Sequence, residues 1–335
     1  MKPKKILLLF DSPYLVKRGH DFKEEFSDFD WDTEREVYKA LLSCGYEVRM
    51  LGLYNDISLL LEEVIDFKPD IIFNLVEVFD QKSHLDKNVA SILEMLQIPY
   101  TGASPRSLLV CCDKGLTKTI LNFHKIKVPQ FYTFYRRRKI WLPKRLNTPL
   151  IVKPLSDEAS RGLSQASIVD SEESLVERVK FIHESIGDDA IAEEYIEGRE
   201  FYVSVLGAYR LQVLPLRELT FGKIPDDEPK IATYKAKWDY EYRKRWQLKN
   251  VFANNLTSEL KKEIERVCKR AYRVLNMKSY ARFDIRVTQE GKIYILEANA
   301  NPSLDPDDEL AESAKKGGIQ YKNLIEKIID FAIKR

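Results

Sequence analysis

The strongest constraint on the fold is an alternation of short apolar runs and amphipathic segments between residues 5 and 77. The first run, KILLLF, is apolar throughout, which is typical of a strand buried on both faces of a sheet. An amphipathic segment, EREVYKALLSCGYEVRML, contains a glycine stop and ends in a second strand, and the pattern then repeats with a proline break. This alternation predicts a small doubly wound parallel sheet, which should end near the turn residues Pro99, Gly102 and Pro105.

The length of the chain leaves room for more than this one domain. With 335 residues, 44% of them hydrophobic, the chain can bury more than one core. The formal net charge of +2 is too small for a general electrostatic binder of nucleic acid, and no run is long enough to span a membrane. The four cysteines lack zinc-type spacing, and no cleavage site follows the first apolar run. We therefore expect a cytoplasmic α/β protein that binds neither nucleic acid nor membrane.

The rest of the chain combines helical patterns with patterns of antiparallel strands. We expect helices at residues 107–126, 171–186, 258–276 and 321–334, and strands at 130–135, 149–155 and within 190–219. The polar segment from Thr220 to Asn255 has little periodicity. A poorly patterned segment of this length in a compact protein is typical of a lid or a binding loop.

A hairpin near the C-terminus carries charged residues within an otherwise apolar pattern. The segments ARFDIRV and KIYILEANA flank the turn residues Glu290 and Gly291. A symmetric register places Asp284 opposite Glu297, with Asn299 on the same face. Facing carboxylates destabilise a sheet unless a cation lies between them, and two carboxylates with an amide oxygen suit Mg²⁺. The alternative is an exposed face on which both carboxylates point to water.

Arg282 lies two residues before Asp284 and therefore on the same face of the predicted hairpin. A guanidinium and carboxylates around one spot are what phosphoryl chemistry requires. An ion pair between Arg282 and Glu297 is the alternative interpretation.

Seven segments, taken together and in order, resemble the ATP-grasp superfamily and within it the D-alanine:D-alanine ligase branch. They are PYTGASPRSLLVCCDKGLTK, LIVKP, AEEYIEGREF, YKAKWD, RFDIRV, YILEANANP and GGIQYKNLIEKII. The resemblance implies an α/β chain whose N-terminal doubly wound parallel sheet precedes an α+β ATP-grasp fold of two subdomains. Its three parts would be an N-terminal substrate-side domain (1–103), a central subdomain with a flexible phosphate loop (104–192), and a C-terminal subdomain with lid and metal hairpin (193–335).

The resemblance implies phosphate contacts in the central subdomain. Lys114 and Lys153 would contact the phosphates of ATP, although a lysine taken alone is more often a solvated surface charge. The loop SDEASRG would fold over the phosphates, with backbone amides around Ala159, Ser160 and Gly162 as donors.

The segment AEEYIEGRE resembles the strand that reads adenine. By resemblance, Glu193 would accept from the adenine amino group, the backbone of Glu194 and Ile196 would pair with the ring, and Glu200 would hold the ribose hydroxyls. Leu296 would complete this part of the ATP site. An exposed acidic face is the competing interpretation of these glutamates.

The resemblance also implies the metal and catalytic residues. Asp284, Glu297 and Asn299 would hold two Mg²⁺ ions, with Mn²⁺ able to substitute. Lys237 would reach the transferred phosphate from the lid, and Arg282 would stabilise a tetrahedral intermediate. The implied reaction has two steps: a carboxylate attacks the γ-phosphate of ATP to give an acyl phosphate, and an amine then expels phosphate.

Several positions depart from the family pattern on the side of the acid and the amine. Glu34 in TEREV is the candidate for holding the first amino acid, but the preceding glycine-rich turn is absent, and a helix N-terminus is the competing interpretation. Glu77 stands where the family has a histidine, Trp238 replaces the lid tyrosine, and Ala159 replaces a loop serine. Asp308 stands where a serine would bind the carboxylate of the second substrate, so an ammonium or another cationic group is favoured there.

The resemblance favours an ATP-dependent carboxylate-amine ligase that acts on small amino-acid or peptide-like acids and amines, with a homodimer left open. Two alternatives are a kinase of the same fold, which would phosphorylate a small molecule, and a nucleotide-binding protein without catalysis. Lys237 and Arg282 favour the ligase over the kinase, and the full set of lysines and metal residues argues against a protein without catalysis.

Overall fold

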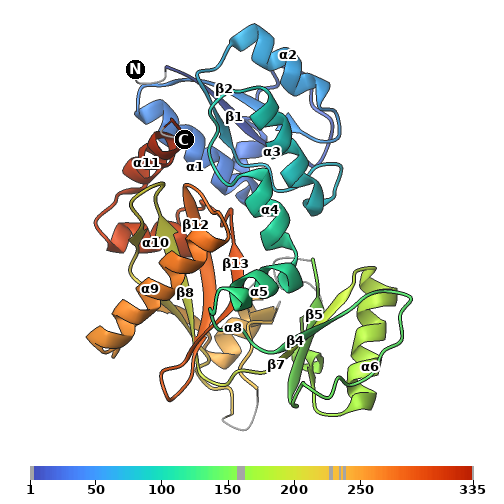
Figure 1. Ribbon diagram of the computed structural model, residues 1–335. Helices are drawn as coiled ribbons and strands as arrows, with labels where there is room; N and C mark the ends of the chain where they lie inside the picture. The colour runs from blue at the N-terminus through green and yellow to red at the C-terminus, as the bar shows by residue number, and fades with distance from the viewer. Residues whose placement is uncertain (1–3, 157–162, 226–228, 234, 237–238, 334–335) are drawn as a thin grey trace.

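The structure is a computed structural model that describes residues 4–156, 163–225, 229–233, 235–236 and 239–333. It consists of three sheets with their covering helices (Figure 1). A mixed α/β architecture with one parallel sheet and two antiparallel sheets confirms the predicted fold class. Within the described residues, no helix is long and apolar enough to cross a membrane.

The first sheet is parallel, with strand order β2-β1-β3, as the alternation of apolar runs predicts. Its strands are β1 (Lys5–Asp11), β2 (Glu47–Leu53) and β3 (Ile71–Asn74); its helices are α1 (Asp32–Ser43), α2 (Ser58–Phe67) and α3 (Asp86–Met95); and short 3-10 turns cover Glu25–Ser27, Phe29–Trp31 and Ser83–Leu85. Both faces of this sheet are covered, so KILLLF contains apolar residues at successive positions.

Alternate residues of β1 contribute to two different cores. Leu7 and Leu9 pack in the core that contains residues of α2 and α3. Ile6, Leu8 and Phe10 pack in the core that contains residues of α1 and of the C-terminal helix α11 (Tyr321–Ile333). The C-terminal helix therefore lies on the first domain, next to α1 (Figure 1).

The chain leaves the first domain through two helices, α4 (Pro105–Cys112) and α5 (Lys114–Phe123), where the sequence predicts one helix over 107–126. The prediction of a continuous helix is wrong because Asp113 adopts an extended conformation with φ −98° and ψ 103°. Its side chain accepts a hydrogen bond from Leu116 N at 2.8 Å and so caps the second helix. The break places Lys114 at the start of α5.

The central sheet is antiparallel with strand order β4-β7-β5-β6. Its elements are β4 (Phe131–Phe134), β5 (Leu150–Pro154), β6 (Ile168–Val169), β7 (Ala190–Glu194), the 3-10 turn Gln165–Ser167, and α6 (Glu172–Phe181) continued by a π-turn (Ile182–Ile186). The predicted division of the chain into 1–103, 104–192 and 193–335 stays a prediction, and its second boundary falls within β7.

The C-terminal sheet is antiparallel with the order β11-β10-β8-β12-β13, and β9 pairs with one end of β8. Its strands are β8 (Arg199–Leu206), β9 (Gln212–Val213), β10 (Arg217–Thr220), β11 (Lys249–Phe252), β12 (Tyr280–Val287) and β13 (Ile293–Asn299); its helices are α8 (Tyr240–Trp246), α9 (Ser258–Val274) and α10 (Glu309–Lys316). The polar segment from Thr220 to Asn255 thus contains a helix and a strand, which its weak periodicity did not predict.

The hairpin β12-β13 pairs Asp284 with Glu297, which confirms the predicted opposition. The predicted register is nevertheless wrong at the turn end, where Ile285 pairs with Ile295. A β-bulge between these two pairs leaves Leu296 as the extra residue and restores the predicted pairing beyond it.

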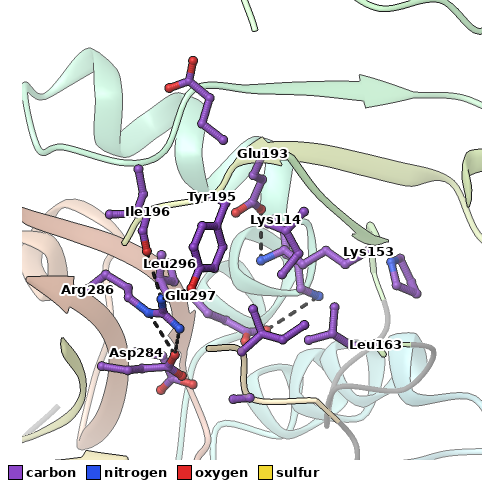
Figure 2. A pocket seen from close by; sticks show the side chains of 16 residues that line it. Lys114, Lys153, Leu163, Glu193, Tyr195, Ile196, Asp284, Arg286, Leu296 and Glu297 are labelled. Atoms are coloured by element: carbon purple, nitrogen blue, oxygen red, sulfur yellow. Dashed lines mark hydrogen bonds and ion pairs between the residues drawn. The ribbon is translucent and has the colours of Figure 1, made fainter. Parts of the chain in front are cut away.

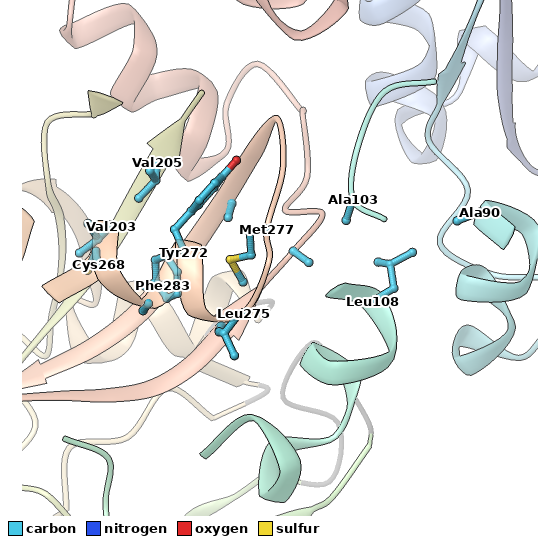
Figure 3. Packing of buried hydrophobic residues seen from close by; sticks show 14 of the residues in the cluster. Ala90, Ala103, Leu108, Val203, Val205, Cys268, Tyr272, Leu275, Met277 and Phe283 are labelled. Atoms are coloured by element: carbon cyan, nitrogen blue, oxygen red, sulfur yellow. The ribbon is translucent and has the colours of Figure 1, made fainter. Parts of the chain in front are cut away.

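One apolar core continues from the first domain into the C-terminal sheet through α4. Figure 3 shows Ala90, Ala103 and Leu108 on one side of this core and Tyr272 and Met277 on the other. The first sheet and the C-terminal sheet are therefore joined by packed side chains as well as by the chain itself.

The predicted turn at Gly102 needs a glycine because of its backbone conformation and its close neighbours. Its φ is +86°, and a Cβ at this position would lie 2.9 Å from Asn301 Oδ1. The same oxygen accepts a hydrogen bond from Ala103 N at 2.7 Å. The residue thus allows the segment after β13 to lie directly against the end of the first domain.

Candidate active site between the central and C-terminal sheets

A narrow cavity of about 90 Å³ lies between the central and the C-terminal sheets. Its wall comes from β5 and β7 on one side and from β12 and β13 on the other. Figure 2 shows the charged side chains that gather around it. They include the predicted residues Lys114, Lys153, Glu193, Glu200, Asp284 and Glu297.

Two lysines of this cavity are held by carboxylates. Lys153 Nζ lies 3.0 Å from Glu193 Oε1, and Lys114 Nζ lies 3.6 Å from Glu297 Oε1. Burial alone would lower the pKa of Lys153, but the carboxylates of Glu193 and Glu297 outweigh it and raise that pKa. The ammonium of Lys153 is therefore charged at neutral pH, as phosphate binding requires.

Glu193 is almost completely buried, with 1% of its surface exposed. A second lysine, Lys118, lies 3.4 Å from the same Glu193 oxygen. Burial lowers the pKa of Lys118 to about 8. The described contacts of Glu193 therefore show a carboxylate between two ammonium groups, a role that the prediction of an adenine contact did not include.

The residues expected to contact adenine and ribose have hydrogen-bond partners within the chain. Glu194 turns its carboxylate away from the cavity, where Oε1 accepts from Asn147 N at 3.2 Å. The carbonyl of Ile196 accepts from Arg286 Nη1 at 2.9 Å. The predicted ribose ligand Glu200 accepts from Arg286 Nη2 at 2.7 Å and is paired with that arginine.

Sequence reasoning missed Arg286, whose side chain is 3% exposed and lines the cavity. Arg282, Asp284 and Arg286 alternate along β12 and share a face. Arg286 could therefore have been predicted in the same way as Arg282, from its position two residues from Asp284 on the same face of the strand.

The predicted metal residues lie together on the hairpin. Asp284 pairs directly with Glu297 across the hairpin. Two residues further along the strands, Arg282 pairs with Asn299. Arg282 binds Asp284 with both ends of its guanidinium, at 2.8 Å and 3.2 Å. The observed ion pair is therefore with Asp284 and not with Glu297, the partner that the alternative interpretation named.

These residues fit a divalent cation that also takes oxygens from a substrate. Two carboxylates and the amide of Asn299 supply oxygen ligands, and Arg282 and Lys114 are the cations now beside those carboxylates. Among the described residues, no three His, Cys, Asp or Glu side chains form a metal-binding group on their own. Burial alone would lower the pKa of Arg282, but the carboxylate of Asp284 has the larger effect. The pKa of Arg282 is therefore raised.

A second cavity, of about 590 Å³, lies between the hairpin and the first domain. Arg282, Glu297 and Asn299 form part of its wall. Glu297 therefore lines both cavities and marks the place where they meet. The remaining wall has five carboxylates and one further cation, Arg243, so it is acidic on balance. The carboxylates belong to Asp11, Glu77, Asp80, Asp308 and Glu309.

Three of these carboxylates have different surroundings. Asp11 accepts backbone hydrogen bonds from Glu77 N at 2.8 Å and Val78 N at 3.3 Å. Glu309 is paired with Arg217 at 2.9 Å. Asp308 stands at the N-cap position of α10 without a side-chain capping bond, so this helix does not occupy its carboxylate.

Glu34, the candidate for holding the first amino acid, is partly buried in α1 and does not belong to the wall of either cavity. Burial raises its pKa to about 7, and the negative charges of Asp11 and Asp305 add to the effect. It therefore lies within electrostatic reach of Asp11, which does line the larger cavity.

Several predicted residues lie outside the part of the chain that the structure describes. They are Lys237 and Trp238 of the lid segment and Ala159, Ser160 and Gly162 of the phosphate loop. Leu296 lies in the wall of the narrow cavity.

Solved structures share this fold. A D-alanine–D-alanine ligase from Bacillus anthracis, whose structure is described as a complex with ATP, superposes with a TM-score of 0.75 at 23% sequence identity, covering 99% of this chain and 98% of that one. A D-alanine-D-alanine ligase from Coxiella burnetii superposes with a TM-score of 0.71 at 19% identity, covering 99% and 94%. The arrangement of sheets in this chain is thus the ATP-grasp fold of these structures.

The sequence comparisons narrow this class to one family. The family model described as "D-ala D-ala ligase C-terminus" matches residues 120–330. The chain is 31% identical over 299 residues to the D-alanine–D-alanine ligase of Aquifex aeolicus, covering 89% of this chain and 93% of that one. It is also 30% identical over 304 residues to an uncharacterised protein, y4sG, of Sinorhizobium fredii, covering 89% and 87%. The chain belongs to the D-alanine–D-alanine ligase family, whose members use ATP and Mg²⁺, and it is an ATP-dependent ligase.

Proposed function

We propose that the chain joins the carboxylate of a small amino-acid-like acid to an amine, at the expense of ATP and through an acyl phosphate. The main support for this proposal is that Glu297 lines both cavities. A group bound in the narrow cavity and a group bound in the acidic cavity would meet beside it. ATP occupies the narrow cavity in this proposal, and the acid and the amine occupy the larger one.

The chain would contribute mainly binding and orientation. Lys114 and Lys153 would bind phosphate oxygens, and Arg282, already held by Asp284, would face the oxygens of the transferred group. Asp284, Glu297 and Asn299 would hold Mg²⁺, which neutralises phosphate charge when bound. We further propose two such ions, with Mn²⁺ as a substitute, and a homodimer as the assembly.

The similarity to known ligases does not favour the kinase or the protein without catalysis. A screen for ADP release over pairs of amino acids, D and L, with mass spectrometry of the products, distinguishes all three. A ligase requires both an acid and an amine and releases ADP with a condensed product. A kinase would release ADP with one substrate and give a phosphorylated product, and a protein without catalysis would release none. Hydroxylamine would trap the acyl phosphate only in the ligase.

We propose that the amine substrate carries an additional ammonium, because the larger cavity is acidic and Asp308 replaces the expected serine. We expect Asp308→Asn to lower kcat/KM about fivefold to tenfold for an amine substrate with a side-chain ammonium, tested with lysine, relative to alanine. The measurement is the ratio of the two kcat/KM values in the product assay.

The neighbouring Asp307, which is exposed, provides the matched control, since Asp307→Asn removes the same charge one residue away. An equal loss for both amines in Asp308→Asn, or the same change of ratio in Asp307→Asn, would rule out selection by Asp308.

We propose that Glu34 acts through its negative charge on the ammonium of the first amino acid. Because burial first, and Asp11 and Asp305 second, raise its pKa to about 7, Glu34 is ionised above this pH and protonated below it. We therefore expect kcat/KM for the first amino acid to fall about tenfold per pH unit below pH 7, and Glu34→Gln to remove this limb of the profile.

Two other carboxyl groups must be distinguished from Glu34 in that profile. Burial also raises the pKa values of Asp11 and Asp305, and both act on Glu34. If the acidic limb persists in Glu34→Gln with an unchanged midpoint, one of these groups carries it and Glu34 does not.

A further inference from the structure

Lys118 is a buried lysine behind the narrow cavity. Neither the family resemblance nor the proposed reaction assigns a role to it. It lies in α5, is 2% exposed, and is absent from the wall of the narrow cavity. Its ammonium donates a hydrogen bond to the carbonyl of Leu296 and lies 3.4 Å from Glu193 Oε1. The ammonium thus connects two strands that belong to different sheets, β13 and β7.

The bond to Leu296 matters because Leu296 is the bulge residue of the metal hairpin. At the turn end of the hairpin, Ile285 pairs with Ile295, and that register would place Leu296 opposite Asp284. The bulge moves Glu297 into this place instead. A bulge interrupts the regular ladder of a hairpin, so the partly buried carbonyl of Leu296 takes a donor from outside the ladder, and Lys118 supplies it.

The contact with Glu193 extends the connection to the phosphate-binding side. Glu193 lies between Lys118 and Lys153, and Lys153 lines the cavity. Removing a lysine from water costs free energy, and an apolar side chain of similar length would fill the same space without that cost. The charge at position 118 therefore has a use other than filling the core.

We propose that Lys118 is a positioning residue that sets the distance between the phosphate lysine Lys153 and the carboxylates of the metal hairpin. It acts through the carboxylate of Glu193 and through the carbonyl of Leu296. This proposal rests on the proposed function, because it assumes that ATP binds between these two groups.

The test compares ATP binding and magnesium dependence in Lys118→Met and in the wild-type chain. We expect Lys118→Met to weaken the binding of ATP, measured by calorimetry in the presence of MgCl₂, by about tenfold or more. We also expect a higher Mg²⁺ concentration for half-maximal ADP release. A merely structural role would reduce the folded fraction, measured by circular dichroism and thermal unfolding, and leave the ATP affinity of the folded protein unchanged.

Lys127→Met is the matched control, because Lys127 is an exposed lysine shortly after the same helix. An unchanged ATP affinity and Mg²⁺ dependence in folded Lys118→Met would overturn the proposal. If this variant does not fold, the double variant Lys118→Met with Glu193→Gln, which removes both buried charges, is compared with Glu193→Gln alone. Weaker ATP binding in the double variant supports the proposal, and equal binding overturns it.

The two proposals can fail separately. If the wild-type chain binds ATP but forms no product with any acid and amine, the proposed ligation fails. The calorimetric comparison still decides the role of Lys118, because it needs ATP binding and no product.

Discussion

Glu297→Gln should reduce ligation by about 1,000-fold, the largest effect that we expect from a single substitution. Glu297 faces Asp284 across the hairpin, lies 3.6 Å from the ammonium of Lys114, and lines both cavities. Glutamine keeps the size of the side chain but removes the charge that a divalent cation and Lys114 both require. The loss should appear in kcat, measured by ADP release under saturating ATP and substrates.

The control for this variant is Glu290→Gln, because Glu290 is exposed in the turn of the same hairpin. It should retain normal turnover. Near-normal activity of Glu297→Gln would contradict the assignment of the hairpin as the metal site, whatever the reaction proves to be.

Arg282→Lys should reduce kcat by about 100-fold while it leaves the KM for ATP close to its normal value. The guanidinium contacts Asp284 through Nε at 2.8 Å and through Nη2 at 3.2 Å. Lysine keeps the charge but cannot make both contacts, so the group that faces the larger cavity would lose its fixed orientation. Steady-state kinetics with varied ATP and varied acid separates the two parameters.

Arg266→Lys is a suitable control, since Arg266 forms an exposed ion pair with Glu263 on α9. Its kinetics should be normal. A large rise in the KM for ATP with unchanged kcat in Arg282→Lys would instead assign Arg282 to nucleotide binding and refute its proposed role at the transferred group.

The parts of the fold that could be predicted were those governed by local periodicity. The run KILLLF and its successors predicted the parallel sheet because strands covered on both faces must be apolar throughout. Periodicity could not predict the break between α4 and α5 at Asp113, because the apolar positions of the two helices continue one helical pattern across this residue. Only the extended conformation of this one residue separates the two helices.

Contacts of the candidate site could be predicted where the two residues are close in sequence. They could be predicted less well where the contact depends on how distant parts of the chain pack together. The opposition of Asp284 and Glu297 followed from the hairpin, although the predicted register did not include the bulge at Leu296. Lys118 is separated from Leu296 by 178 residues, so no local pattern could indicate their contact. Likewise, the pairing of Arg286 with Glu200 depends on the alignment of β12 beside β8.

The position of α11 on the first sheet has a consequence for the order of events during synthesis. Ile6, Leu8 and Phe10 are made at the beginning of the chain, but part of the apolar layer that covers them, including Ile325 and Ile329, is made near the end. At about 5–20 residues per second, these strand residues wait on the order of half a minute for their last packing partners. The sheet of the first domain is therefore translated early, but one of its faces stays partly uncovered until α11 has been made.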